Sequence, residues 1–182
     1  PPHNLIKQHL PNSFFFYKPK DIVAGDFYWL ETDQKNNDVL LFAAADCTGH
    51  GVPGAFMSLI GSTLLKEVSR MSSVNSPEDI MSTLDGELFD MLNKQSKEIF
   101  TDDGMDISIV EFNMSAQYLR IASANRPVLI YRDQELIEVR GDRHAIGGSS
   151  RLSERKFTQH EIKLRKGDSF YLFSDGITDQ FG

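Results

Sequence analysis

The chain has 182 residues, of which 40% are hydrophobic and 25% are charged, and this ordinary globular composition excludes a disordered or fibrous protein. Its 26 acidic residues outnumber its 19 basic residues, and the formal net charge of −7 argues against nucleic acid as the main partner. The single cysteine excludes an internal disulfide, and no apolar stretch approaches the ~18 residues of a membrane-spanning helix, so we expect a cytoplasmic protein without direct membrane insertion.

The first part of the chain predicts a short connection followed by strands. Residues 1–12 read as the end of an upstream linker, with a turn near Pro11. Runs of aromatic and aliphatic residues then predict three strands, at Ser13–Lys18, Asp26–Thr32 and Val39–Ala45.

The middle of the chain predicts two helices. A glycine-rich loop leads into Ala55–Arg70, where apolar residues recur at helical spacing. Ser76 is the expected N-cap of a second helix that runs to Asn93, and Pro77 suits the first turn of this helix.

The rest of the chain returns to short apolar runs separated by turn-like residues. These runs predict six further strands, at Ile107–Phe112, Tyr118–Ala122, Val128–Tyr131, Leu136–Val139, Phe157–Leu164 and Phe170–Phe173. Because the strands are separated from the helices along the chain, the sequence favours an α+β fold. An antiparallel β-sandwich, with the helical pair on one outer face, would bury all of these apolar faces.

Three aspartates lie at the ends of predicted strands. Asp26 opens an aromatic strand, whereas Asp46 and Asp175 each follow an apolar strand directly and lead into a loop. A carboxylate beside buried residues is costly unless a cation meets it, and no Lys or Arg lies near Asp46 in the sequence. This pattern indicates a hard divalent cation such as Mg²⁺ or Mn²⁺, although each aspartate taken singly also suits an ordinary turn.

Four motifs in order along the chain then suggest a family: Asp21–Trp29, Ala45–Ala55, Asp103–Asp106 and Phe173–Gly176. Together they resemble the SpoIIE-like branch of the metal-dependent (type 2C, PPM) Ser/Thr protein phosphatases. The resemblance implies an α-β-β-α sandwich whose phosphatase domain covers residues 13–182. It also implies that the family's C-terminal helix, and its last strand with a further metal-binding aspartate, are missing from this sequence.

The resemblance further implies a two-metal site that holds Mn²⁺ or Mg²⁺. Asp46 matches the aspartate that bridges both metals, and the backbone carbonyl of Cys47 matches the next ligand. Asp175 matches a direct ligand of one metal, and Asp26 matches an acid that binds a metal or its coordinated water. Asp106 matches a supporting residue or a ligand of a third metal. Asp26, Asp46 and Asp175 are therefore the expected catalytic residues, and hydroxide bridging the two metals would attack the phosphorus.

By the same resemblance, the substrate would be phosphoserine or phosphothreonine on an anti-anti-sigma factor of the STAS type. A sensor or receiver domain would lie upstream in the same chain. The general acid stays unassigned, because relatives carry a histidine where this chain has Thr48, and His50 lies two positions further on.

Several alternatives stay open at the level of sequence. The domain could be a non-catalytic, phosphatase-like module that binds a partner, and a nucleotide cyclase would also use paired aspartates on two metals. Cys47 could be a catalytic thiol instead of a buried residue that offers its carbonyl. Arg126 could meet a phosphate or a peptide carboxylate, or could be an ordinary surface cation.

Overall fold

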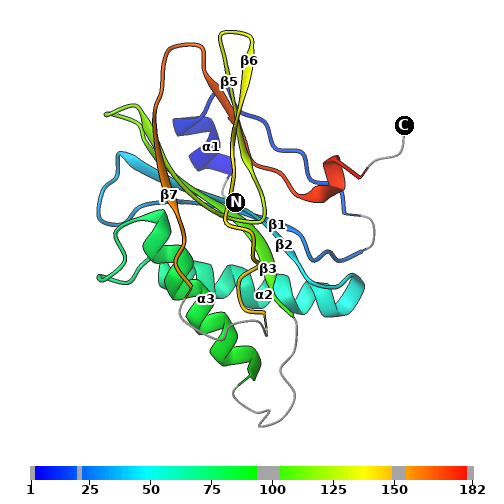
Figure 1. Cartoon of the computed structure of the whole chain (residues 1–182). Helices are drawn as coiled ribbons and strands as arrows, with labels where there is room; N and C mark the ends of the chain where they lie inside the picture. The colour runs from blue at the N-terminus through cyan, green and yellow to red at the C-terminus, as the bar shows by residue number, and fades with distance from the viewer. Residues whose placement is uncertain (1–2, 20–21, 94–102, 149–154, 180–182) are drawn as a thin grey trace.

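The computed structural model describes residues 3–19, 22–93, 103–148 and 155–179. Within these residues the fold has two long helices, one short N-terminal helix and eight strands; Figure 1 shows their arrangement. The helices are α1 (His3–His9), α2 (Gly51–Val68) and α3 (Pro77–Asn93), and a 3₁₀ turn, η1, covers Asp175–Ile177. The strands are β1 (Phe27–Thr32), β2 (Val39–Cys47), β3 (Met105–Asn113), β4 (Tyr118–Ala124), β5 (Val128–Arg132), β6 (Glu135–Val139), β7 (Gln159–Lys163) and β8 (Ser169–Tyr171).

The strands form two antiparallel sheets. The larger sheet has the order β1-β2-β3-β4-β7, and the smaller one has the order β6-β5-β8. Helices α2 and α3 lie together on one side of the larger sheet, and the β5–β6 hairpin lies on the other side (Figure 1). The chain passes from the larger to the smaller sheet directly after β4, through residues 125–127. We call this short connection the crossover.

The larger sheet is buried on both faces. Along β2, Leu41 and Ala43 belong to the core beneath the helices, whereas Leu40 and Phe42 belong to the core between the sheets. Successive strand residues point to opposite faces, so a nearly continuous apolar run is what such a central strand requires.

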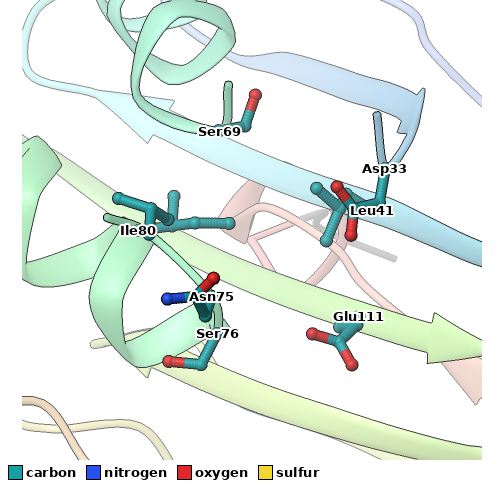
Figure 2. A pocket seen from close by; sticks show the side chains of 8 residues that line it. Asp33, Leu41, Ser69, Asn75, Ser76, Ile80 and Glu111 are labelled. Atoms are coloured by element: carbon teal, nitrogen blue, oxygen red, sulfur yellow. The ribbon is translucent and has the colours of Figure 1, made fainter. Parts of the chain in front are cut away.

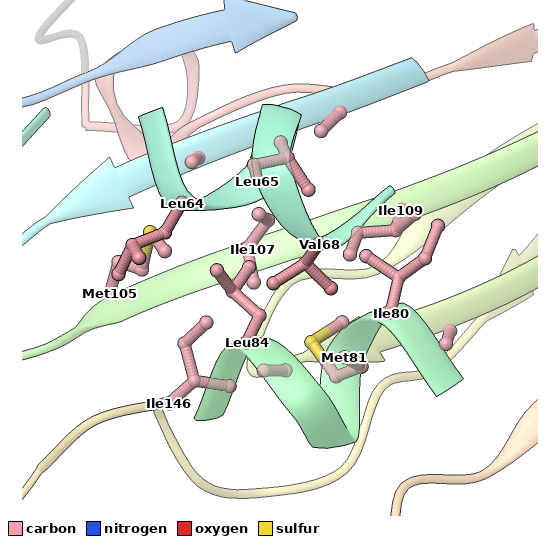
Figure 3. Packing of buried hydrophobic residues seen from close by; sticks show 14 of the residues in the cluster. Leu64, Leu65, Val68, Ile80, Met81, Leu84, Met105, Ile107, Ile109 and Ile146 are labelled. Carbon is pink, nitrogen blue, oxygen red and sulfur yellow. The ribbon is translucent and has the colours of Figure 1, made fainter. Parts of the chain in front are cut away.

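The core beneath the helices is made of interlocking aliphatic side chains. Figure 3 shows Leu84 of α3 and Val68 of α2 packed toward Ile107 and Ile109 of β3. Leu84, Val68, Ile107 and Ile109 are all fully buried. Helix α3 begins as the sequence predicts, because the Ser76 hydroxyl oxygen accepts a hydrogen bond of 3.1 Å from the backbone N–H three residues later.

The predicted α+β sandwich with flanking helices is confirmed, and most strand predictions are correct to within two residues at each end. The largest of these differences are two residues; for example, β7 begins at Gln159 instead of Phe157, and β8 ends at Tyr171 instead of Phe173. None of the helices in the described residues is both long and apolar enough to cross a membrane.

Two predictions near the N-terminus need correction or extension. The strand predicted at Ser13–Lys18 is wrong, because this segment is irregular and pairs with no strand. Its Phe15 and Tyr17 rings instead pack on Tyr28 with centroids 5.3 and 5.5 Å away, while Phe14 stays 76% exposed. Residues expected to form a linker include helix α1, yet the assignment of 1–12 to a linker and of 13–182 to one domain stays a prediction.

Replacing Leu84 with Ala tests the packing of α3 on the larger sheet. We expect Leu84→Ala to lower the free energy of unfolding by about 2–5 kcal/mol, because it leaves a cavity among fully buried neighbours. Met91→Ala on the same helix is the matched control; since Met91 is 52% exposed, the loss should stay near 0.5 kcal/mol. Urea unfolding measures both, and equal losses would contradict this packing.

Candidate active site

The register of the larger sheet brings four polar side chains to one of its edges. Asp46 of β2 and Asp106 of β3 are directly opposite each other. Asp26 immediately precedes Phe27, which pairs with Ala45, so Asp26 reaches the same edge from β1. Asn125 reaches it from the other side, immediately after β4. Residues 80 positions apart in the chain therefore meet because adjacent antiparallel strands begin and end at this edge.

Strand periodicity places these carboxylates between the two sheets. Asp46 lies four residues after Phe42, and Asp106 lies four residues before Val110; both Phe42 and Val110 belong to the core between the sheets. Residues an even number of positions apart point to the same face of a strand. The acidic edge is thus the open, polar end of an otherwise apolar layer.

The smaller sheet contributes the remaining carboxylate. After β8 the chain turns into η1, whose first residue is Asp175. The hydroxyl of the preceding Ser174 donates a hydrogen bond of 2.5 Å to Asp26, which joins the two sheets across the acidic edge. Asp26, Asp46, Asp106 and Asp175, predicted from sequence as site residues, are therefore brought together.

Arg126 lies at the centre of this cluster. One terminal nitrogen of its guanidinium group, Nη2, is 2.5 Å from Asp46 Oδ2, 2.9 Å from Asp175 Oδ2 and 3.4 Å from Asp106 Oδ2. The Arg126 side chain is only 18% exposed, so the alternative that it is an ordinary surface cation is wrong. Asn125 adds a hydrogen bond of 2.8 Å from Nδ2 to Asp106.

The backbone of Arg126 is fixed by two buried serines. Ser108 and Ser123 face each other across β3 and β4, with their hydroxyl oxygens 2.6 Å apart. Both hydroxyls also lie within hydrogen-bonding distance of the Arg126 carbonyl oxygen. Since Asn125 adopts a positive φ of 59°, the crossover turns sharply at this point and directs the arginine side chain into the acidic cluster.

The crowding of carboxylates changes the chemistry of Asp46. Burial, followed by the negative charges of Asp26 and Asp175, raises the pKa of Asp46 to about 7, against the opposing effect of Arg126. The single positive charge of Arg126 therefore does not balance the negative charges of the cluster. Such a group of oxygen donors matches the ligands that hard divalent cations prefer.

The loop after β2 packs against backbone atoms at very short range, and this explains its glycines. A Cβ on Gly25 would lie 3.0 Å from the Cys47 carbonyl oxygen, and a Cβ on Gly54 would lie 2.4 Å from the Gly49 carbonyl oxygen. Gly49 itself has a φ of +90°, which side chains rarely allow. The start of α2 is thereby held against the acidic edge, with the Cys47 carbonyl beside the residue that precedes Asp26.

The same loop carries two polar side chains, Thr48 and His50. The Thr48 hydroxyl donates to the Gly104 carbonyl oxygen at 2.9 Å and accepts from the Gly104 N–H at 3.0 Å, so it anchors the loop to the start of β3. His50 is exposed at the N-cap position of α2 and makes no side-chain capping bond. Neither observation assigns a general acid.

In the part of the chain that the structure describes, no three His, Cys, Asp or Glu side chains are grouped as a ready metal site. At the acidic edge, Arg126 Nη2 lies within 3.4 Å of Asp46, Asp106 and Asp175.

A separate acidic pocket at the start of α3 is too small for a substrate. Figure 2 shows Asp33 and Glu111 at this pocket, whose volume of about 20 Å³ suits one water molecule.

Three features of this edge were not expected from the sequence: the contact of Arg126 with the aspartates, the bond from Asn125 to Asp106, and the paired serines Ser108 and Ser123. The sequence carried one signal, because Asn125-Arg126-Pro127 follows a predicted strand and Asn and Pro are frequent in turns. The acidic partners of Arg126, however, depend on the register between strands, which the hydrophobic pattern of the sequence does not determine.

Known proteins that are similar to this chain include phosphatases and members of the SpoIIE family. The family model for Stage II sporulation protein E (SpoIIE) matches residues 36–181. Phosphoserine phosphatase RsbU of Bacillus subtilis (strain 168) is 27% identical over 167 residues, which cover 88% of this chain and 44% of RsbU. The chain therefore spans less than half of that curated relative.

Solved structures also resemble this fold. The SiaA-PP2C domain of Pseudomonas aeruginosa has a TM-score of 0.83 at 28% identity, over 98% of this chain and 66% of that one. The PP2C phosphatase domain, with a fragment of the regulatory domain, of SpoIIE from Bacillus subtilis has a TM-score of 0.65 at 22% identity. That match covers 86% of this chain and 43% of the other, and at this identity it concerns the fold alone.

The Cys47 thiol is predicted to be unreactive in the folded chain. Burial, with the charges of Asp46 and Asp26 next, raises the pKa of Cys47 from 9.0 to about 12. At pH 8 we expect DTNB to modify the native chain about 100-fold or more slowly than the urea-unfolded chain. Rapid, complete labelling of the native chain would contradict this and would revive the alternative of a catalytic thiol.

The raised pKa of Cys47 makes the free energy of unfolding depend on pH. The neutral thiol stabilises the fold below about pH 9, and this contribution falls as the pH rises toward 12, because the unfolded chain releases the proton first. A Cys47→Ala variant should lose less stability than the wild type over that pH interval, as measured by urea unfolding.

Proposed function

Because this chain belongs to the SpoIIE family, the branch of metal-dependent type 2C protein phosphatases that its four motifs indicated, we propose that it hydrolyses phosphoserine or phosphothreonine on a regulatory protein. The observation that carries the proposal is the convergence of Asp46, Asp106 and Asp175 on a single point at the open end of the sandwich. This arrangement supports a centre for divalent cations at the same point.

The residues present fit Mn²⁺ or Mg²⁺ by type and by charge. Asp46 and Asp175 would be the principal ligands, with the Cys47 carbonyl and Asp26 beside them and Asp106 in a supporting position. Burial, followed by the negative charges of Asp26 and Asp175, raises the pKa of Asp46 to about 7, and a divalent cation beside this carboxylate would oppose these effects. When bound, a pair of such ions activates water and neutralises the phosphoryl oxygens.

The chain's own residues prepare the site for this chemistry. The link from Ser174 to Asp26 and the register of Asp46 with Asp106 fix the positions of the carboxylates before any ion arrives. The buried Cys47 thiol, whose pKa is raised to about 12, is a poor candidate for a protein nucleophile, which agrees with direct attack by water.

A shallow cleft beside the site suits a peptide that carries the phosphate. It has a volume of about 190 Å³, and its lining residues are Asn125, Pro127, Glu138, Arg140, Gly141 and Arg143. Because Asn125 also contacts Asp106, a peptide in this cleft would lie next to the carboxylates. Glu138 is salt-bridged to Arg140 at 3.2 Å, so Arg143 leaves the cleft with a net positive charge that favours a segment with acidic residues near the phosphorylated side chain.

The proposed partner is a phosphorylated STAS-type anti-anti-sigma factor, and the proposed regulator is a sensor or receiver domain upstream in the same protein. Support for this comes from RsbU, a relative named as a phosphoserine phosphatase. A cytoplasmic location is part of the same proposal.

A second candidate function is favoured by one observation. The salt-bridged guanidinium of Arg126 satisfies the carboxylates in part without any metal, as a non-catalytic partner-binding module would require. A measurement of phosphatase activity distinguishes the phosphatase from the non-catalytic module.

Phosphate release is predicted to require Asp46. In the full-length protein we expect Asp46→Asn to lower Mn²⁺-dependent release of phosphate from a phosphoserine protein of the STAS type by about 100-fold or more, because the carboxylate that both ions would share is lost. Chelation of the metal with EDTA should have a similar effect.

Asp133→Asn is the matched control for this assay, since it makes the same chemical change at a side chain that is 81% exposed. Its rate should equal that of the wild type. Equal rates for Asp46→Asn and the wild type would refute the phosphatase proposal and favour the non-catalytic module.

A further inference from the structure

Arg126 occupies the position on which the site carboxylates converge. Its Nη2 atom contacts Asp46, Asp106 and Asp175, which come from two strands of one sheet and from the segment that follows the other sheet. No other Lys or Arg in the described residues is paired with any of these three aspartates. The guanidinium is thus the cation that neutralises the cluster in this structure.

Charge counting shows that this neutralisation is incomplete. Asp26, Asp46, Asp106 and Asp175 carry four formal negative charges and Arg126 carries one positive charge, so three negative charges are left at the edge. A divalent cation at this point would serve the carboxylates better than the guanidinium does. The two cannot occupy the same place, because Nη2 already lies at 2.5–3.4 Å from all three carboxylate oxygens.

The side chain of Arg126 can leave without disturbing its backbone. The Arg126 carbonyl oxygen is held by Ser108 and Ser123, and its N–H donates to the Ala124 carbonyl oxygen at 2.8 Å. These contacts involve only main-chain atoms of Arg126. Its buried Nε–H has no hydrogen-bond partner among the described residues, so the hydrogen bonds and ion pairs recorded for the guanidinium are those to the carboxylates.

We propose that Arg126 is an internal cation that holds the carboxylate cluster together in the metal-free chain and that divalent ions must displace. This inference rests on the proposed function, because it takes the acidic edge to be the metal centre. Arg126 is then a positioning residue: it stabilises the metal-free fold and weakens metal binding. A purely structural arginine would support both the fold and the metal site.

The test measures two quantities with opposite expected signs. In EDTA, Arg126→Gln should lower the melting temperature, because the carboxylates lose the guanidinium that contacts all three of them. In calorimetric titration with MnCl₂, the same variant should bind Mn²⁺ about tenfold or more tightly than the wild type, because no cation has to be displaced. Arg140→Gln is the matched control: Arg140 lines the neighbouring cleft and is 74% exposed, so neither quantity should change.

Arg126→Lys keeps the positive charge and serves as the second variant in case Arg126→Gln does not fold. Its affinity for Mn²⁺ should stay within about threefold of the wild type. If the wild type binds Mn²⁺ and Arg126→Gln binds it equally or more weakly, this inference is overturned while the proposed metal centre stands. If neither protein binds Mn²⁺, the proposed metal centre fails, and this inference fails with it.

Discussion

Mutual repulsion among the acidic side chains at one edge of the larger sheet is the constraint on which this site depends. Four strands deliver carboxylate or amide groups to the same edge, and the segment after β8 adds Asp175 from the other sheet. The guanidinium of Arg126 lies between Asp46 and Asp175 and offsets part of this repulsion. A structure that places its acids so close, with one guanidinium to balance them, favours the entry of further cations.

The rest of the architecture keeps that edge in place. The apolar cores on both faces of the larger sheet fix the register that sets Asp46 opposite Asp106. Close contact between Gly54 and the Gly49 carbonyl holds the start of α2 against the loop that follows β2. The buried pair Ser108 and Ser123 anchors the crossover at the other side of the site. Each of these contacts acts on the backbone, and the link from Ser174 to Asp26 and the bond from Asn125 to Asp106 hold two of the acidic side chains.

The sequence allowed most of the fold and part of the site to be predicted. Continuous apolar runs such as Val39–Ala45 and the cap at Ser76 identified strands and helices, and the four motifs identified the family that the SpoIIE model then confirmed. The aromatic run at Ser13–Lys18 misled because rings can pack on a neighbouring residue without a strand to pair with. The contact between Asp46 and Arg126 was out of reach, since an ion pair across 80 residues depends on register and on the path between sheets.

Anomalous diffraction from crystals grown with Mn²⁺ would locate the ion and the side chain of Arg126 in the same experiment. We expect a manganese peak bonded to both Asp46 and Asp175, with the guanidinium of Arg126 moved away from them. If no such peak is found at saturating Mn²⁺, and Arg126 still bridges the two carboxylates, then these aspartates do not form a metal centre that displaces Arg126.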